Sequence, residues 1–324
     1  MPARASGPWN ERLRASGASF QQFPSWNDAM QSWRLRMTYL VCENADGALA
    51  FVCVQGLGFG RARVGIVREG PIWLRPLDAG AVDACLGALG DRLRELGFVV
   101  VCFAHRDAEL LASLERCAPS TREVMIPFTV DDREALLVPL ADSDEAQLAA
   151  FAPVARRDVR RALAAGYTLE ESASPRALAR AWPIWKKELQ RQNVFHRSRS
   201  TYARLLRTTG ESGFARLFLA SREGRPVQAI LVLFAGAEAT YALGALDRDA
   251  LGDLPSPSCL LHWRAMRAAR ARGALAYDLG SRSGSVHRFK SKFRPRELSK
   301  APPVSLILDP ALFPLCRWLL PRLR

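Results

Sequence analysis

One order of predicted elements occurs twice along the chain, and this repeat limits the fold more than any single motif does. In each half, helical stretches come before a meander of apolar strands, and a long helix and one further strand come after it. In the first half these are FPSWNDAMQSW, the strands MTYLVCE, ALAFVCVQ and RARVGIV, the helix AGAVDACLGALGDRLRELG and the strand FVVVCFA. The repeat predicts duplicated α/β modules.

The second half follows the same plan. Residues 145–166 and 175–192 are predicted to be helical, and the remaining elements are the strands FARLFLAS, VQAILVLFAG and ATYALGAL, the helix CLLHWRAMRAARARG and the strand ALAYDLG. We place the boundary near Pro139 to Asp144. The first module then covers residues 1–140, joined by the C-terminal segment 301–324, and the second covers residues 141–300.

Lysine is rare in this basic chain. Among 324 residues with a formal net charge of +14, 46 are lysine or arginine, and only five of these are lysines: Lys186, Lys187, Lys290, Lys292 and Lys300. The charge suits an anionic partner such as RNA, a nucleotide-linked substrate or a membrane surface, although an arginine-rich composition alone also produces it. Where arginine is the general cation, a remaining lysine is expected at sites that need a compact ammonium group.

The cysteines and histidines do not form a recognisable reactive or metal-binding pattern. The seven cysteines include no C-x-x-C pair, several lie in apolar runs, and the four histidines lack metal-ligand spacing. We therefore expect buried free thiols in a reducing cytosol, with neither a zinc site nor a cysteine nucleophile.

No targeting segment is visible at the start of the sequence, and no window has the roughly 18 apolar residues of a membrane-spanning helix. We expect a cytoplasmic protein. The last residues, ALFPLCRWLLPRLR, combine apolar side chains with arginines, so they could rest on the inner face of an anionic membrane. The alternative is a terminal helix that docks on the body of the protein.

The second half also has the element order of a GNAT-type N-acyltransferase, and several motifs resemble the FemABX family of peptidoglycan cross-bridge aminoacyltransferases. These motifs are spread over residues 18–310 in the family's order. They are FPSWNDAMQSW, REGPIW, RRDVRRALAAGYTLEE, ELQRQNVFHRSRSTYARLL, YALGAL and YDLG followed by FKSKF. The resemblance implies an α/β fold of two tandem GNAT-like (acyl-CoA N-acyltransferase-like) modules, each with a mixed central sheet flanked by helices.

The resemblance also implies an activity and a set of site residues. In that family an aminoacyl group passes from aminoacyl-tRNA to an amine of a peptidoglycan precursor, UDP-linked or lipid-linked, without a metal or other cofactor. By position, Lys290 would stabilise the oxyanion and Phe289 would shape the donor channel, as catalytic residues. Arg191 would contact acceptor phosphate, and Tyr241 and Trp26 would line the acceptor site. The alternatives are a solvated arginine at a helix end and a tyrosine packed in the core.

The chain departs from the family pattern in two places. After Trp26, the family's lysine for nucleotide-linked acceptors is replaced by Ala29 or Met30, which weakens the case for a UDP-linked acceptor. The sequence also has no heptad insertion that would form a coiled-coil arm, so tRNA would contact the globular surface. The candidate RNA-binding residues are Arg156, Arg157, Arg160, Arg161 and Lys292, and a solvated helix face is the alternative.

Two other functions remain open at this point. The first is an acyl-CoA-dependent N-acyltransferase acting on a cell-envelope polysaccharide or lipid precursor. The run QGLGFG matches a pyrophosphate-binding motif, but a predicted strand follows it instead of a helix, and DRDALGDLPSPSC is acidic, so CoA is disfavoured. The second is a non-catalytic RNA-binding protein.

The conformation of FKSKF decides where its lysines point. If FKSKF is extended, Phe289 points away from Lys290, and Lys292 shares the face of Lys290. The SRSGS loop before it would give Lys290 a flexible approach to the cleft.

Overall fold

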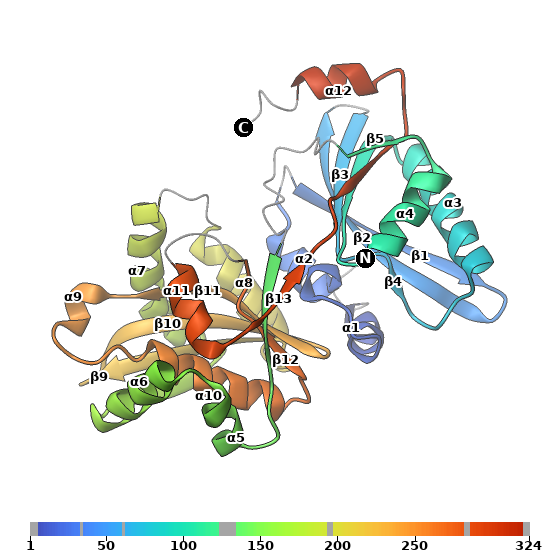
Figure 1. The fold of residues 1–324 in the computed structure, drawn as a ribbon. Helices are drawn as coiled ribbons and strands as arrows, with labels where there is room; N and C mark the ends of the chain where they lie inside the picture. The colour runs from blue at the N-terminus through green and yellow to red at the C-terminus, as the bar shows by residue number, and fades with distance from the viewer. Residues whose placement is uncertain are drawn as a thin grey trace. The chain divides into compact units, whose positions relative to one another are not determined.

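The computed structural model describes residues 6–32, 35–59, 62–122, 134–192, 197–281 and 286–319. Its contacts divide the chain into two compact units: unit 1 is Met1–Arg133 with Ser299–Arg324, and unit 2 is Glu134–Leu298 (Figure 1). Unit 2 begins at Glu134 and not at residue 141, because strand β7 (Glu134–Pro139) pairs with strand β12 (Ala276–Asp278) in the sheet of that unit.

Unit 1 is built on a mixed sheet with the strand order β1-β2-β3-β5-β14-β6, and β4 pairs with β2. The first three strands form an antiparallel meander, β5 lies parallel to β3, and β14 lies antiparallel to β5. The strands are β1 (Leu35–Asn44), β2 (Gly47–Phe59), β3 (Ala62–Arg68), β4 (Ile72–Trp73), β5 (Phe98–Ala104), β6 (Ser120–Thr121) and β14 (Val304–Ile307).

The long helix of unit 1 starts and stops where its sequence predicts. The Asp78 side chain accepts a hydrogen bond from the Ala81 amide at the first turn, and Gly97, with φ +78°, follows the last turn. Leucines of this helix and of the next one pack with β5 in one core. The α-helices of the unit are α1 (Ser6–Ala15), α2 (Pro24–Met30), α3 (Ala79–Glu95), α4 (Ala108–Cys117) and α12 (Phe313–Leu319).

The C-terminal helix α12 docks on unit 1. Phe313 and Cys316 pack against Val99 and neighbouring valines, while Leu315 and Trp318 are 54% and 56% exposed on the other side. The docked arrangement is the alternative that the sequence analysis set beside a membrane-resting segment. Among the described residues, no helix is long and apolar enough to cross a membrane.

Unit 2 repeats the plan with the strand order β13-β7-β12-β11-β10-β9-β8. The strands β8 to β11 are antiparallel neighbours, β12 is parallel to β11, and β7 is antiparallel to β12. The strands not yet located are β8 (Thr168–Ser172), β9 (Ala215–Arg222), β10 (Arg225–Ala235), β11 (Glu238–Leu246) and β13 (Arg296–Ser299). As in unit 1, a meander is followed by one parallel strand and then by an antiparallel strand from a distant part of the chain.

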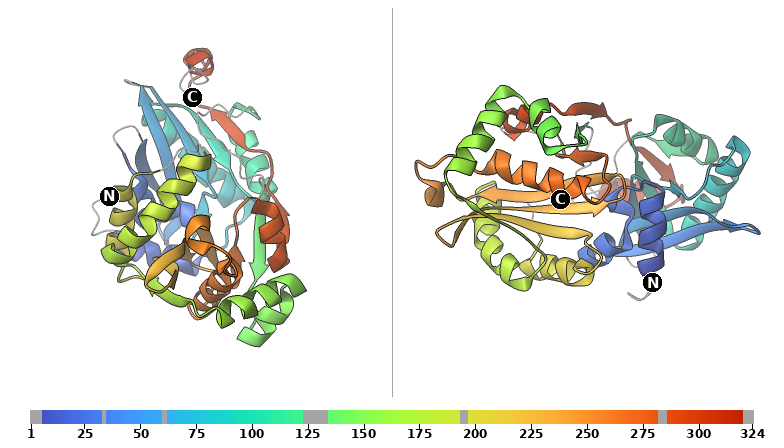
Figure 2. Two further views of the ribbon diagram at one scale, coloured as in Figure 1. Left: turned by 90° about the vertical axis from the view of Figure 1, so that its left-hand side faces the viewer. Right: turned by 90° about the horizontal axis from the view of Figure 1, so that it is seen from below.

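Helices cover both faces of the unit 2 sheet, which is why β10 is an almost continuous apolar run. Figure 2 shows α6 and α10 on one face and α7 and α8 on the other. The Trp185 indole of α7 is buried and donates a hydrogen bond to the Ala229 carbonyl of β10 at 3.0 Å. The helices are α5 (Asp144–Ala150), α6 (Pro153–Ala164), α7 (Pro175–Gln192), α8 (Arg199–Thr209), α9 (Arg248–Leu251), α10 (Ser258–Arg270) and α11 (His287–Lys290).

One predicted helix is two helices. Residues 145–166 form α5 and α6, separated at Phe151 and Ala152, because Pro153 starts α6 at its first position and restricts the residue before it to extended backbone. Phe151 turns inward at the break and is fully buried.

Candidate active site

The segment that carries Lys290 is helical, and the extended conformation considered in the sequence analysis is wrong. Residues His287–Lys290 form α11, and a 3₁₀ turn, Ser291–Phe293, follows it. The reason is the spacing of the two phenylalanines: Phe289 and Phe293, four residues apart, share a helix face, and their rings meet edge to face at 5.3 Å. Phe293 also packs edge to face on Phe151 at 5.1 Å. Lys290 and Lys292 therefore point in different directions.

Lys290 is buried at the end of β12. Its side chain is 8% exposed, and Nζ donates a hydrogen bond of 2.7 Å to the Ser281 carbonyl oxygen. Asp278, also buried, accepts a hydrogen bond from the Gly280 amide nearby. Burial lowers the pKa of Lys290 from its ordinary value, and the charge of Asp278 opposes this shift. The rest of the SRSGS loop, residues 282–285, lies outside the described residues.

The sheet of unit 2 opens next to this lysine. The parallel pairing of β11 with β12 ends at Thr240 and Asp278, and β11 continues from Tyr241 to Leu246. Such a divergence of two parallel strands exposes backbone groups to a substrate at the point where the strands part. Tyr241 is half-buried there, and burial raises the pKa of its phenol to about 12.

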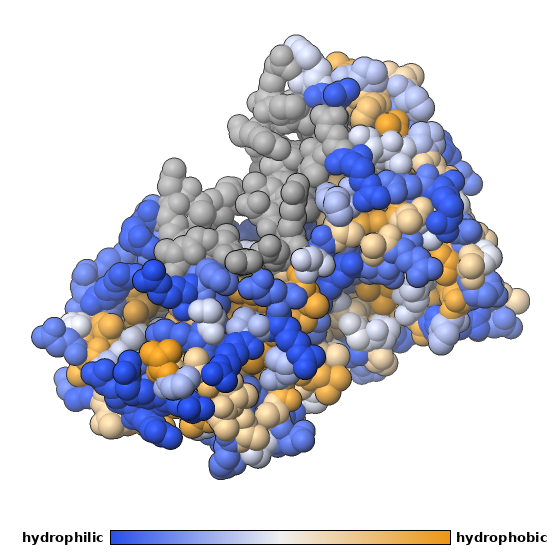
Figure 3. All heavy atoms as spheres, viewed as in Figure 1, coloured by the Kyte–Doolittle hydropathy of each residue, from blue (hydrophilic) through white to orange (hydrophobic). Residues whose placement is uncertain are grey.

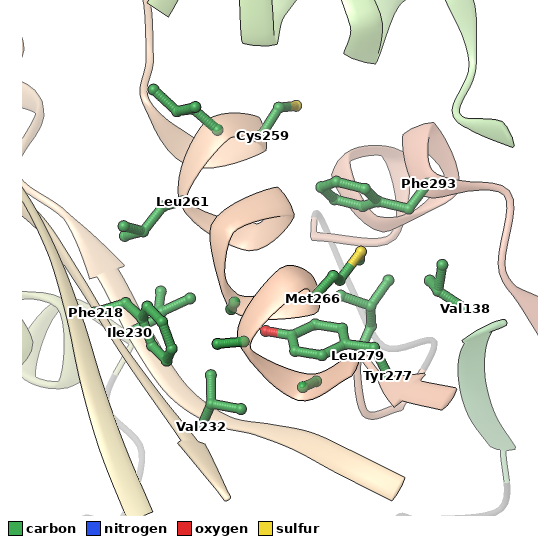
Figure 4. Close-up of a cluster of buried hydrophobic side chains, with 14 of the residues drawn as sticks. Val138, Phe218, Ile230, Val232, Cys259, Leu261, Met266, Tyr277, Leu279 and Phe293 are labelled. Carbon is green, nitrogen blue, oxygen red and sulfur yellow. The ribbon is translucent and has the colours of Figure 1, made fainter. Parts of the chain in front are cut away.

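A neutral histidine completes the wall behind the lysine. His262 of α10 is buried, and its Nδ1 lies 3.1 Å from the Tyr277 hydroxyl. Figure 4 shows Tyr277 within the buried cluster, with its hydroxyl next to helix α10. Its ring meets those of Tyr241 at 4.8 Å and Phe289 at 5.5 Å. Burial, with a smaller contribution from the charge of Lys290, lowers the pKa of His262 to about 3. The imidazole is therefore uncharged at neutral pH, and the Lys290 ammonium stands against an apolar, aromatic wall.

Three residues of the site, His262, Tyr277 and Asp278, were not predicted from the sequence. The histidines have no metal-ligand spacing, and YDLG has the pattern of a strand end, so neither motif indicated a site residue. A polar side chain inside the apolar helix stretch CLLHWRAM was the available signal, because a buried imidazole requires a hydrogen-bond partner. Among the described residues, no three His, Cys, Asp or Glu side chains gather into a potential metal site.

The predicted site residues fall into separate groups. Lys290, Phe289 and Tyr241 all border His262 or the end of β12. Arg191 lies in the last turn of α7, is 62% exposed, and forms a two-pronged hydrogen bond with Glu188 at 2.9 and 2.6 Å. Trp26 lies in α2 of unit 1, where its ring meets that of Phe20 edge to face at 5.0 Å. The roles of Arg191, Tyr241 and Trp26 stay predictions.

The predicted basic cluster is helical, but only part of it faces solvent freely. Arg157, Arg160 and Arg161 are exposed on α6. Figure 3 shows that the surface is largely hydrophilic where Figure 1 places this helix. Arg156 is half-buried and donates a hydrogen bond to the Ala149 carbonyl oxygen at 3.0 Å. This carbonyl lies in the last turn of α5, where backbone oxygens have no partner within the helix. Lys292 forms an ion pair of 2.9 Å with Asp158 of α6. Arg156 and Lys292 thus also hold neighbouring segments together.

In the CoA-like run QGLGFG, residues 55–59 lie in β2 and Gly60 lies outside the described residues. The next described element is strand β3, so no helix N-terminus stands behind those glycines. In unit 2, Asp247 caps the short helix α9, and both Asp247 and Asp249 are paired with Lys187. The run in β2 therefore lacks the strand-to-helix geometry of a pyrophosphate site.

Comparisons with known proteins identify the fold. Residues 151–291 match the model of the Acetyltransferase (GNAT) domain family. The structure of FemX shares 15% identity with the chain over 98% of each chain, with a TM-score of 0.81. The C-terminal domain of a putative lysylphosphatidylglycerol synthetase from Agrobacterium fabrum shares 16% identity over 97% of this chain and 96% of that one, with a TM-score of 0.59. No curated protein sequence matches the chain.

A tandem GNAT protein from the clavulanic acid biosynthesis pathway is also similar, with 13% identity over 95% of this chain and 96% of that one and a TM-score of 0.54. The predicted fold class, two tandem GNAT-like modules, is confirmed. The GNAT domain match and these neighbours support the prediction of an acyltransferase.

Proposed function

We propose that this protein is an aminoacyltransferase that forms an amide bond between an aminoacyl group, carried by aminoacyl-tRNA, and an amine of a peptidoglycan-precursor peptide. The observation that carries the proposal is the buried Lys290 ammonium at the point where β11 and β12 diverge. The fold shared with FemX over nearly the full length of both chains supports it.

The chemistry follows from the position of this ammonium. The acceptor amine attacks the carbonyl carbon of the aminoacyl ester, and a negative charge develops on the carbonyl oxygen. Among the described residues Nζ makes one hydrogen bond, to Ser281, which leaves two of its three N–H groups for that oxygen. A cation fixed beside a developing oxyanion in an apolar site stabilises the transition state by about 3–4 kcal/mol. The C–O bond to the tRNA ribose then breaks.

The proton of the attacking amine has to leave by another route. His262 is close to Lys290 but, with a pKa of about 3, it is too weak a base at neutral pH to remove that proton. The Tyr277 hydroxyl is bound to His262, and burial raises its pKa well above the ordinary value. We therefore assign the proton to water or to the leaving ribose oxygen, and give the protein the tasks of holding the ester and stabilising the charge.

The exposed arginines of α6 supply the surface for the tRNA. Arg157, Arg160 and Arg161 would neutralise about three phosphates, so the logarithm of tRNA affinity should fall with the logarithm of salt concentration with a slope of about −2 to −3. Arg156 and Lys292 would contribute less, because each also bonds within the protein.

The test is a transfer assay with purified protein, a pool of charged tRNAs, and UDP-linked and lipid-linked muropeptides, read by mass spectrometry. We expect a precursor heavier by one amino-acid residue with the wild type and a loss of most turnover with Lys290→Arg. Lys186→Arg, at an exposed lysine of α7, is the matched control and should keep full activity. Full transfer activity in both Lys290→Arg and Lys290→Ala would exclude the catalytic role of Lys290.

A second candidate is an acyl-CoA-dependent N-acyltransferase. The match of residues 151–291 to the Acetyltransferase (GNAT) domain family supports it. Binding of acetyl-CoA without binding of aminoacyl-tRNA would select this candidate. A non-catalytic RNA-binding protein would show RNA affinity that Lys290→Arg leaves intact and no transfer with any donor.

A further inference from the structure

Two cysteines in unit 1, far from each other in the sequence, lie with their sulfur atoms almost in bonding contact. Cys42 is near the end of β1 and Cys85 is in the middle of α3, and the two Sγ atoms are 2.7 Å apart. A disulfide bond is about 2.05 Å long, so the sulfurs are about 0.7 Å from bonding distance. A small rotation of the two side chains is enough to close that gap.

Local structure explains why the thiols meet. The pairing of β1 with β2 shifts register between Cys42 and Glu43, and such a bulge changes the direction of a side chain on the bulged strand. Helix α3 packs over β1 and places Cys85 on its buried face. The two thiols thus face each other between the sheet and its covering helix.

The thiols also border a cavity. It has a volume of about 210 Å³ and lies between β1, β2 and α3, with mostly apolar walls that include Leu40, Val52, Trp73 and Leu89. Cys42 is half-buried, whereas Cys85 is 5% exposed. A small oxidant in the cavity can therefore reach the pair, and Cys42 is the more accessible of the two sulfurs.

We propose that Cys42 and Cys85 form a redox modification site, in which a small hydroperoxide such as hydrogen peroxide converts the two thiols into a disulfide that links β1 to α3. In the first step the Cys42 thiolate attacks one peroxide oxygen, the O–O bond breaks, and Cys42 sulfenic acid and hydroxide form. In the second step the Cys85 sulfur attacks the Cys42 sulfur, the S–O bond breaks, and the released hydroxide takes the Cys85 proton to form water. The hydroxide from the first step takes up the proton that Cys42 lost on ionising. The two sulfurs are therefore oxidised, and one peroxide is reduced to two waters.

The difference in exposure between the two thiols supports this order of events. Cys42 is half-buried and meets the oxidant first, whereas Cys85 is 5% exposed and acts as the resolving thiol. Burial, together with the hydrogen bond to Cys42, raises the pKa of Cys85, which agrees with this role. The site goes beyond the proposed function and does not depend on it, because it lies in unit 1 and the candidate active site lies in unit 2.

Cys117 of α4 offers a matched comparison within the same unit. It is half-buried like Cys42, but its Sγ contacts the Asp83 carbonyl oxygen at 3.9 Å and not a thiol. Exposure alone would make Cys117 as sensitive to peroxide as Cys42, whereas pairing predicts a disulfide only between Cys42 and Cys85.

The experiment treats the full-length native protein with hydrogen peroxide, alkylates the remaining thiols, and maps the cysteines by mass spectrometry. Cleavage after Arg residues and after Glu43 separates Cys42 from Cys53. We expect a cross-linked pair of peptides containing Cys42 and Cys85, 2 Da lighter than the sum of the two reduced peptides, while Cys117 remains alkylated. Reduction with dithiothreitol should restore both thiols.

A second measurement does not depend on the peptide map. A disulfide that closes a loop of 43 residues should raise the melting temperature of the oxidised wild type by roughly 5–10 °C over the reduced protein. Cys42→Ser and Cys85→Ser should abolish this shift, and Cys117→Ser should retain it. The proposal is overturned if both cysteines remain fully alkylated after peroxide treatment, or if Cys117 is oxidised as fast as the pair.

Discussion

The two units each bury the charge of a lysine, but they surround it differently. In unit 1, Lys300 is 14% exposed, and its Nζ lies 3.0 Å from the carboxylate of the buried Glu69. The backbone amide of Arg106 also donates a hydrogen bond to that carboxylate at 3.3 Å. In unit 2, Lys290 is bonded to a neutral carbonyl oxygen, and burial prevails over the charge of Asp278 in setting its pKa.

The difference separates a structural cation from one available to a substrate. An ion pair inside the protein offsets much of the free energy that the lysine loses on leaving water. A buried ammonium without a full ion pair is stabilised most when a negative charge develops beside it. Only the second kind suits a site where an oxyanion develops. The comparison therefore predicts opposite phenotypes for two changes from lysine to methionine.

The largest effect should come from Lys290→Met. Transfer turnover should fall about 10²–10³-fold, because the ammonium that faces the oxyanion is removed. The melting temperature should stay level or rise, because a buried charge is replaced by an apolar chain of similar length. Single-turnover kinetics and calorimetry on the same preparation measure both. A protein that loses its fold together with its activity would show that Lys290 is structural, as Lys300 is.

The second effect should come from Lys300→Met, with the reverse result. The buried Glu69 carboxylate loses its closest cation but keeps its ion pair of 3.4 Å with Arg106, so the free energy of unfolding of unit 1 should fall by about 1.5–3 kcal/mol. The folded fraction should keep its transfer activity. Denaturant unfolding followed by tryptophan fluorescence measures the loss, and Lys186→Met is the control at an exposed position. An unchanged midpoint would mean that the ion pair contributes nothing.

The third prediction concerns pH. The pKa of Lys290 is lowered in the folded protein, so between that lowered value and 10.5 the unfolded chain binds more protons than the folded one. The free energy of unfolding attributable to Lys290 should therefore rise with pH across this window, by at most about 1.4 kcal/mol per pH unit, and the cost should be fully present below it.

The difference in unfolding free energy between the wild type and Lys290→Met, measured from pH 7 to 10.5, isolates this contribution from other titrating groups. Turnover should fall over the same window, because the neutral amine no longer stabilises the oxyanion. A pH-independent difference between the two proteins would contradict the lowered pKa.

The smallest effect on stability should come from Arg191→Gln. Arg191 is exposed, and its ion pair with Glu188 is a surface contact, so the melting temperature should not change measurably. The Michaelis constant for a phosphate-bearing acceptor should rise, because the guanidinium fork is lost. Arg199→Gln, at an exposed arginine of α8, serves as the control. Equal Michaelis constants in both variants would remove Arg191 from the acceptor site.

The meander strands and the long helices could be predicted from the sequence, because each carries its own periodic pattern. β10 is a continuous apolar run between turn residues, and α3 has its cap at Asp78 and its stop at Gly97. The short strands β7 and β14 could not be predicted with their partners. They pair with segments far away in the chain, and residue spacing does not report such pairing.

The candidate site shows the same limit. Lys290 was found through a motif resemblance, but its neighbours His262 and Tyr277 come from a helix and a strand that meet only in three dimensions. The conformation of α11 was predictable in principle, since the four-residue spacing of Phe289 and Phe293 is a helical signal. An alternating pattern of lysines and serines concealed it.

The position of β14 late in the sequence affects how unit 1 folds during synthesis. β14 covers the edge of β5, yet it is synthesised about 200 residues later, after all of unit 2. At a ribosomal rate of about 5–20 residues per second, this edge of the apolar strand Phe98–Ala104 remains unpaired for roughly 10–40 s until β14 has been synthesised. During synthesis, unit 1 therefore carries an open sheet edge that is sensitive to aggregation, and unit 2, whose strands are all made in one stretch, can be completed first.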